Sequence, residues 1–347
     1  MIKNILLVGL AFLLIIGGIN SANAKNCSCK WDKTFPKSDK VNIQKVEFKN
    51  RFGIKLVGDL YTPKTMKKDE KLPAIAISGP FGAVKEQSSG LYAQTLAERG
   101  FITLAFDPSY TGESSGTPRH VASPDINTED FSAAVDFLSN NKNVNPDRIG
   151  IIGICGFGGF AINAAAIDTR IKATTAVTMY DMTRVSAKGY NDSIDENARY
   201  EMKQALNKQR TEDFKRGKYL GADGLPEKLS GNEPQFVKDY WGYYKTKRGF
   251  HARSINSNGK WNMTSSLSLI NQPILQYSSE IRTPVLVVHG ENAHSRYFGE
   301  DAFKKLKGDN KELLIVKGAN HVDLYDGGDK NAIPFDKIES FYKENLK

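Results

Sequence analysis

The stretch Arg148-Ile-Gly-Ile-Ile-Gly-Ile-Cys155-Gly-Phe-Gly-Gly-Phe160 decides the fold. Its β-branched run, Ile149 to Ile154, predicts a buried strand, and the alanine-rich run that follows the glycines, Ala161 to Ala166, predicts a helix. A strand, a sharp turn and a helix with one nucleophilic side chain at the turn form a nucleophile elbow. Cys155 occupies this turn, so we interpret it as a nucleophile rather than as an inert buried thiol.

The predicted helix after Cys155 supports this interpretation. Its N-terminus offers backbone N–H groups to a developing oxyanion and predicts a lowered pKa for the thiol. We expect the N–H groups of Gly156 and of Phe81, in the loop after another predicted strand, to form an oxyanion hole. One position departs from the usual elbow pattern, because Phe157 stands where a glycine is expected two residues after the nucleophile.

Apolar runs and helical patterns alternate on both sides of the elbow. Besides the elbow strand, we predict strands at Val41 to Phe48, Ile54 to Tyr61, Pro73 to Ile77, Phe101 to Phe106, Ala173 to Thr178, Pro284 to Val288 and Leu313 to Val316. Buried strands that alternate with helices predict an α/β fold, with a mainly parallel sheet and helices on both of its faces. Ligands of such folds bind at the carboxyl ends of the strands.

The N-terminus predicts export. Lys3, an apolar run and the small-x-small sequence Ala22-Asn-Ala24 are typical of a secretory signal peptide that is cleaved after Ala24. We therefore expect a periplasmic or secreted protein without stable membrane insertion after cleavage. The predicted divisions are a signal peptide at 1–24, a polar tail at 25–40, a core at 41–181 and 281–347, and an insertion at 182–280.

The insertion interrupts the alternation of strands and helices at the edge where ligands are expected. We interpret it as a cap or lid, and a surface insertion without function is the alternative. Its aromatic cluster, Tyr240 to Tyr244, and its cationic run, Arg248 to Arg253, have two possible interpretations. They either face an aromatic or anionic substrate or form the small core of the insertion itself.

The charge distribution argues against a nucleic-acid-binding protein, and two of the cysteines have no assigned role. The formal net charge is +9, but acidic residues are interspersed and no nucleic-acid motif is present, so we predict no nucleic-acid partner. The sequence contains three cysteines. Cys27 and Cys29 lie in the polar tail, too close in sequence for an unstrained disulfide, and we assign them no role.

Several motifs together resemble the α/β-hydrolase family. They are Gly82-Ala-Val-Lys-Glu-Gln87, Ala105-Phe-Asp107-Pro-Ser-Tyr-Thr-Gly-Glu-Ser114, Gly153-Ile-Cys155-Gly-Phe-Gly-Gly159, Met179-Tyr-Asp181 and Gly318-Ala-Asn-His321-Val-Asp-Leu-Tyr325. Within the family they are most similar to dienelactone-hydrolase-like and bacterial YcjY-type hydrolases, and they also resemble fungal polyketide transferases. The resemblance implies an esterase-like hydrolase with a Cys-His-acid triad, no metal and no organic cofactor.

His321 is the candidate base of this triad. It follows the last predicted strand, as the order nucleophile, acid, histidine requires, and its neutral imidazole would take the thiol proton. The resemblance places an Asp where Asn292 and Ala293 stand, and Asn292 could orient His321 instead. We predict Glu291 as the acid, slightly ahead of Asp181, although Glu291 could also be a solvated loop carboxylate.

Three functions fit these residues. The first is a hydrolase that cleaves ester, lactone or thioester bonds of a small acyl substrate through an acyl-enzyme. The second is an acyltransferase with the same triad and an alcohol or amine acceptor. The third is a binding protein that kept the fold without the chemistry.

Overall fold

The computed structural model describes residues 31–347 and builds one eight-stranded sheet in the order β1-β2-β4-β3-β5-β6-β7-β8. The strands are β1 (Val41–Lys49), β2 (Lys55–Pro63), β3 (Leu72–Ser78), β4 (Ile102–Phe106), β5 (Val144–Ile154), β6 (Ala173–Val177), β7 (Val285–Gly290) and β8 (Lys311–Val316). β2 runs antiparallel to β1 and β4, and all pairs from β4 to β8 are parallel. The predicted signal peptide, 1–24, and both tail cysteines lie outside the described residues.

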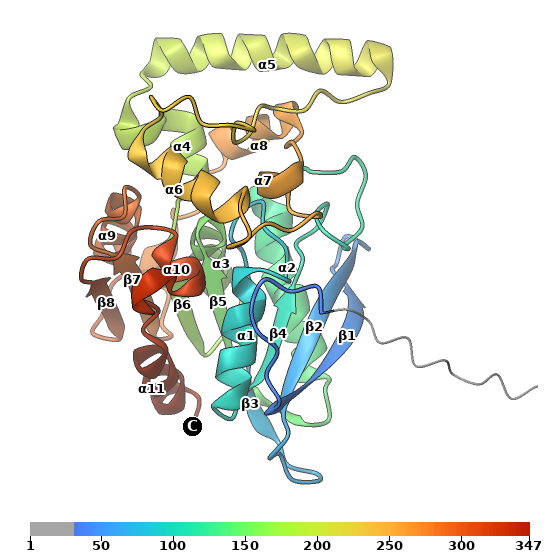
Figure 1. Ribbon diagram of the computed structural model, residues 1–347, viewed down its shortest axis with the longest axis vertical. Helices are drawn as coiled ribbons and strands as arrows, with labels where there is room; N and C mark the ends of the chain where they lie inside the picture. The colour runs from blue at the N-terminus through green and yellow to red at the C-terminus, as the bar shows by residue number, and fades with distance from the viewer. Residues whose placement is uncertain (1–30) are drawn as a thin grey trace, which may run out of the picture. The chain divides into compact units, whose positions relative to one another are not determined.

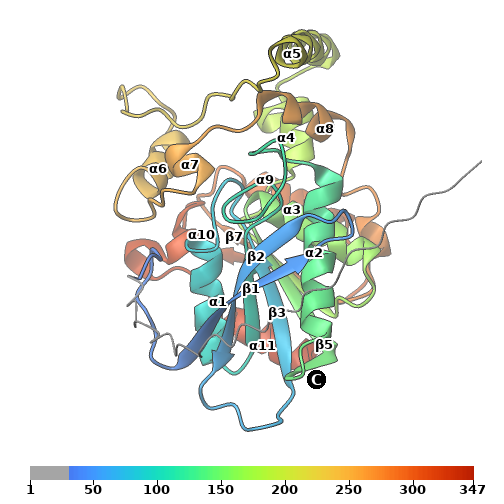
Figure 2. The ribbon, with the colours of Figure 1, turned by 90° about the vertical axis from the view of Figure 1, so that its right-hand side faces the viewer.

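Helices cover both faces of the sheet, as predicted (Figure 2). α1 (Ser88–Glu98) and α11 (Phe335–Asn345) contribute to one buried apolar cluster, whereas α2 (Pro124–Ser139) and α3 (Gly156–Ile167) contribute to the other. The central strands are buried on both faces, which explains why their sequences are continuous apolar runs rather than alternating ones. The structure adds α9 (Arg296–Lys305), which the sequence analysis left unassigned.

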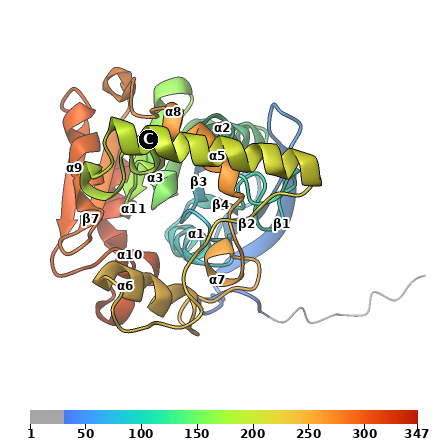
Figure 3. The ribbon, with the colours of Figure 1, turned by 90° about the horizontal axis from the view of Figure 1, so that it is seen from above.

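Residues 178–284, between β6 and β7, form an inserted segment of short helices and one long helix (Figure 1). Its helices are α4 (Met182–Lys188), α5 (Glu196–Arg216), α6 (Gln235–Tyr244), α7 (Ile255–Asn258) and α8 (Ser266–Asn271). The segment lies over the carboxyl edge of the sheet, with α5 outermost (Figure 3). The two flanking core strands, β6 and β7, nevertheless pair directly with each other, so the insertion does not divide the sheet.

Local sequence explains where the long helix of this segment begins and ends. The Asp195 side chain accepts a hydrogen bond from the Ala198 N–H, which satisfies an unpaired donor of the first turn. Gly217 ends α5 in the left-handed conformation, with φ of 61°, which glycine adopts without steric cost. Within residues 31–347, no helix is both long and apolar enough to cross a bilayer.

Candidate active site

Cys155 lies at the strained turn between β5 and α3. Its backbone has φ of 57° and ψ of −126°, a conformation that a residue with a side chain rarely adopts. Hydrogen bonds to the end of β6 hold this conformation, because the Cys155 N–H donates to the Val177 carbonyl at 2.9 Å and the Cys155 carbonyl accepts from the Tyr180 N–H at 2.9 Å. The residue is only 6% exposed.

The elbow tolerates Phe157 because the close approaches fall on other residues. A Cβ atom on Gly153 would lie 2.0 Å from the Phe157 carbonyl oxygen, and one on Gly158 would lie 2.5 Å from the Met179 Cβ. The Phe157 ring itself is buried in the core, 5.3 Å from the Phe160 ring centroid. The departure in sequence pattern therefore leaves the turn intact.

Two backbone donors reach the Cys155 side chain. The N–H groups of Phe81 and Gly156, the residues expected to form an oxyanion hole, both lie close enough to the thiol to lower its pKa. Burial raises the pKa of the thiol, whereas hydrogen bonds from Tyr325, Phe81 and Gly156 lower it, and the net pKa lies above its usual value. The prediction of a lowered thiol pKa is therefore wrong, because desolvation outweighs the helix N-terminus.

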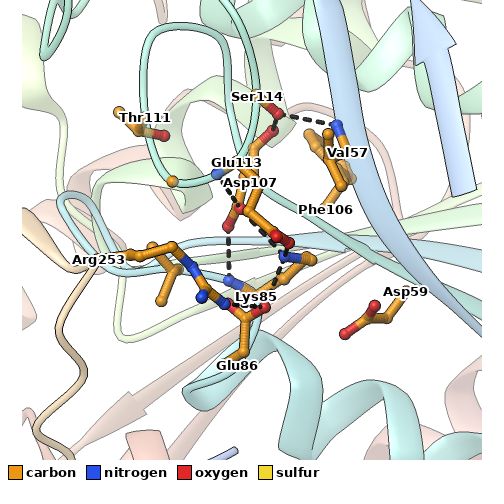
Figure 4. A network of polar contacts seen from close by, with 12 residues as sticks. Val57, Asp59, Lys85, Glu86, Phe106, Asp107, Thr111, Glu113, Ser114 and Arg253 are labelled. Carbon is orange, nitrogen blue, oxygen red and sulfur yellow. Dashed lines mark hydrogen bonds and ion pairs between the residues drawn. The ribbon is translucent and has the colours of Figure 1, made fainter. Parts of the chain in front are cut away.

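A buried ion cluster fixes the loop that carries Phe81 (Figure 4). The Lys85 ammonium lies 2.6 Å from a Glu86 carboxylate oxygen and 3.3 Å from one of Asp107, and it also pairs with Glu113. Burial lowers the pKa of Lys85, but the adjacent carboxylates of Asp107 and Glu86 raise it more, so the amine stays charged. The cluster explains why a lysine with no exposed side chain is tolerated here.

The inserted segment binds to the same loop. Arg253 pairs with Glu86 at 2.7 Å and with Asp32 at 3.2 Å. The Asn256 amide donates to the Phe81 carbonyl at 2.7 Å and so holds the residue whose N–H faces the thiol. The cation of Arg253 is thus engaged by the protein, and the reading in which it faces an anionic substrate does not fit this geometry.

His321 is buried, and hydroxyl groups bind both nitrogens of its ring. Nδ1 lies 2.5 Å from Ser295 Oγ and 3.0 Å from Thr178 Oγ1, and Nε2 lies 3.0 Å from the Tyr325 hydroxyl. Burial, and to a smaller extent the nearby imidazoles of His294 and His289, lower the pKa of His321 well below its usual 6.5. The imidazole is therefore neutral and suited to accept a proton.

The structure does not bring either predicted acid to His321. The Glu291 carboxylate is exposed and accepts from the Gly318 N–H at 2.8 Å, because the loop after β7 turns this side chain outward. Asp181 accepts from the N–H groups of Thr183 at 3.0 Å and Arg184 at 2.9 Å, and so caps α4. The prediction that Glu291 or Asp181 orients His321 does not agree with this structure.

Asn292, the other candidate, is also exposed. Its backbone N–H donates to the Ala319 carbonyl at 2.9 Å. Ser295 and Thr178 occupy the place at Nδ1 where a triad acid was expected. The sequence analysis missed both hydroxyls, since a serine five residues beyond a strand carries no distinguishing pattern.

Aromatic rings surround the imidazole. The ring centroids of Tyr180, Tyr240 and His294 lie 5.4, 5.3 and 5.3 Å from that of His321. Tyr240 belongs to α6, so the inserted segment contributes directly to the surroundings of the candidate base. In the described part of the chain, no group of three or more His, Cys, Asp and Glu side chains is placed to hold a metal ion.

Comparison with known proteins assigns the family. The profile of the family described as X-Pro dipeptidyl-peptidase (S15 family) matches residues 53–323, more than half of the chain. The chain belongs to the S15 family. An S15 match, together with the strand order and a solved α/β hydrolase of a Penicillium species, confirms the predicted α/β-hydrolase fold. That hydrolase, GrgF, has a TM-score of 0.70 at 22% identity over 88% of this chain and 99% of its own.

Bacterial and fungal proteins are similar in sequence to this S15-family chain. PA2218, an uncharacterized protein of Pseudomonas aeruginosa, is 59% identical over 91% of this chain and 84% of its own. Its crystal structure has a TM-score of 0.88 at 58% identity, over 92% of this chain and 98% of that one. YcjY of Escherichia coli is 34% identical over 87% and 99% of the two chains.

The fungal similarity covers a shorter part of the chain. The thiohydrolase aneE of Aspergillus aculeatus is 34% identical over 140 residues, which are 40% of this chain and 42% of its own. The predicted relationship to YcjY is confirmed by these comparisons. The dienelactone-hydrolase likeness stays a prediction.

Proposed function

We propose that this protein hydrolyses ester, lactone or thioester bonds, with Cys155 as the nucleophile and His321 as the base. One observation carries the proposal. Cys155 lies at a strained strand-to-helix turn, and the N–H groups of Phe81 and Gly156 converge on its thiol. Donors in that position would stabilise an oxyanion formed when the sulfur attacks a carbonyl, by about 3 kcal/mol each.

The reaction follows from the protonation states of the site. The thiol releases its proton, Nε2 of the neutral imidazole gains one, and the sulfur forms a bond to the acyl carbon. The tetrahedral intermediate then collapses, and the leaving group takes the proton from the imidazolium. Water, deprotonated by the same imidazole, attacks the acyl-enzyme and releases the acid with the free thiol. Ser295 and Thr178 hold Nδ1 throughout and keep the ring oriented.

The surroundings of the thiol favour an uncharged acyl group. Tyr180, Tyr240 and Tyr244 lie near Cys155, and burial raises the pKa of each, so all three stay neutral. Arg253 is paired with carboxylates, as is Arg248, which binds Asp326 at 2.7 Å. We further propose that residues 182–280 act as a cap, since Tyr240 and Tyr244 reach the site from that segment.

Three alternatives have support of their own. Acyl transfer would use the same acyl-enzyme with another acceptor, and fungal relatives of both kinds are known, the thiohydrolase aneE and the polyketide transferase claH. Cleavage of X-Pro peptides is suggested by the description of the family. The third alternative is a binding protein without catalysis, and it is supported because no carboxylate among the described residues is hydrogen-bonded to His321.

One set of assays separates these functions. Wild-type protein, Cys155→Ala and Cys155→Ser would be assayed with acyl thioesters, p-nitrophenyl esters and lactones of graded length, and with an X-Pro p-nitroanilide. We expect wild-type turnover of thioesters or esters to the free acid, complete loss in Cys155→Ala and at most weak activity in Cys155→Ser. Product masses with added alcohols or amines would reveal transfer. Wild-type activity in Cys155→Ala would contradict the proposed nucleophile.

A further inference from the structure

Tyr325 stands between the candidate nucleophile and the candidate base. It lies in α10 (Asp323–Asp326), directly after the loop that carries His321, and its side chain is fully buried. Its hydroxyl lies 3.0 Å from His321 Nε2, and it also adjoins the Cys155 thiol, whose pKa it lowers. Among the described residues, no hydrogen bond links the thiol directly to the imidazole, and the phenol oxygen adjoins both groups.

One arrangement that satisfies the hydrogen-bonding capacity of these groups has the imidazole proton on Nδ1. With Nδ1–H donating to Ser295 Oγ at 2.5 Å, Nε2 has no proton and accepts from the phenol O–H. The phenol oxygen then accepts from the thiol S–H. After proton transfer the bonds reverse, because the Nε2–H donates to the phenol oxygen and the phenol O–H donates to the thiolate. Both states are fully hydrogen-bonded.

We propose that Tyr325 is a catalytic residue that relays the proton between Cys155 and His321. The S–H bond breaks as its proton forms an O–H bond to the phenol, while the original phenol proton leaves the oxygen and bonds to Nε2. The phenol is unchanged, and the products are a thiolate and an imidazolium. This proposal rests on the proposed nucleophilic function of Cys155.

Packing prevents the phenol from turning away. The Tyr325 ring makes edge contacts with Tyr243 at 5.1 Å and Tyr244 at 6.1 Å, both from the inserted segment. The other titratable groups around the thiol and the imidazole are Tyr180, Tyr240, Tyr244, His289 and His294, all buried or partly buried and neutral. None of them is hydrogen-bonded to both reacting groups, so Tyr325 alone among the described residues has the position of a relay.

The test compares Tyr325→Phe with Tyr92→Phe. Tyr92 is a buried phenol that donates to the Leu324 carbonyl at 2.7 Å, so this control removes a hydroxyl that holds the same helix without touching the site. We expect Tyr325→Phe to lower kcat/KM by about 100-fold or more, the usual contribution of positioned proton transfer. It should also slow alkylation of Cys155 by iodoacetamide at pH 7. Tyr92→Phe should do neither.

A second measurement uses the wild-type protein, so that it stands even if the variant does not fold. If two protons move in the same step, as in the relay, kcat/KM depends on the deuterium fraction of the solvent along a curve. Transfer of one proton directly from the thiol to the imidazole predicts a straight line. A straight line, or a Tyr325→Phe variant with the kcat/KM of Tyr92→Phe, overturns the relay. Activity that survives Cys155→Ala would instead overturn the proposed function, so the two failures are distinguishable.

Discussion

At the scale of single residues, the site pairs a neutral thiol with a neutral imidazole. A carboxylate at Nδ1 would favour the imidazolium, but Ser295 and Thr178 carry no charge and leave burial as the dominant influence on His321. The thiol pKa is raised for the same reason. The nucleophile is therefore generated during the reaction rather than held as a preformed ion pair.

This protonation state predicts the pH dependence of kcat/KM. Only a neutral imidazole can take up a proton when the thiol ionises, so activity falls where His321 becomes protonated in the free protein. Because the pKa of His321 lies well below 6.5, activity should persist as the pH falls through 6.5 and decline only in more acidic solution. Values of kcat/KM for an ester substrate from pH 4 to pH 9 measure this acidic limb of the pH profile. An acidic inflection at pH 6.5 or above would contradict the lowered pKa of His321.

Replacing Ser295 tests the role of the hydroxyl at Nδ1. Ser295→Asp places a carboxylate beside Nδ1 and should shift the acidic limb to higher pH, because an adjacent negative charge stabilises the imidazolium. Ser295→Ala, the matched control, should lower kcat/KM by about tenfold without raising the limb, since it removes an orienting bond and adds no charge. A limb that stays in place in Ser295→Asp argues against contact between this position and His321.

At the scale of elements, the Lys85 cluster joins three parts of the fold. Lys85 and Glu86 lie in the loop after β3, Asp107 follows β4, and Arg253 comes from the inserted segment. The loop after β3 also carries Phe81, so the same ion pairs that attach the insertion fix a donor at the thiol. Stability and site geometry thus depend on one buried group of charges.

Removing the cation of this cluster should destabilise the protein strongly. Lys85→Met leaves buried carboxylates without their partner and should cost about 3–5 kcal/mol of unfolding free energy. Lys45→Met is the matched control, because Lys45 pairs with Glu113 at 2.7 Å from an exposed position and should cost below about 1 kcal/mol. Urea unfolding at pH 7 compares them, and equal losses would show that burial of the cluster contributes nothing.

At the scale of the whole molecule, local patterns predicted the architecture well. The buried runs and the elbow at Cys155 were predictable because strand burial and a glycine-rich turn are properties of short stretches. The hydroxyl partner of His321 was not, since the path of the loop after β7 decides that Glu291 points outward and Ser295 inward. The pKa of the thiol and the position of Tyr325 likewise depend on packing between distant segments.

The N-terminus provides a prediction at this scale that concerns cellular location. We propose that residues 1–24 are a signal peptide and that the mature protein begins at Lys25, because a short apolar run precedes Ala22-Asn-Ala24. Intact-mass measurement of the protein isolated from its own cells measures the cleavage site directly. A mass that includes residues 1–24 would mean that the leader is retained.

The central claim is that Cys155 carries the acyl group during turnover. Rapid acid quenching of the wild-type protein with an acyl thioester, followed by peptide mass spectrometry, tests it most directly. We predict that the peptide with Cys155 gains the mass of the acyl group, that the adduct disappears once substrate is exhausted, and that Cys155→Ala forms none. An adduct on another residue, or turnover by Cys155→Ala without any adduct, would contradict the account.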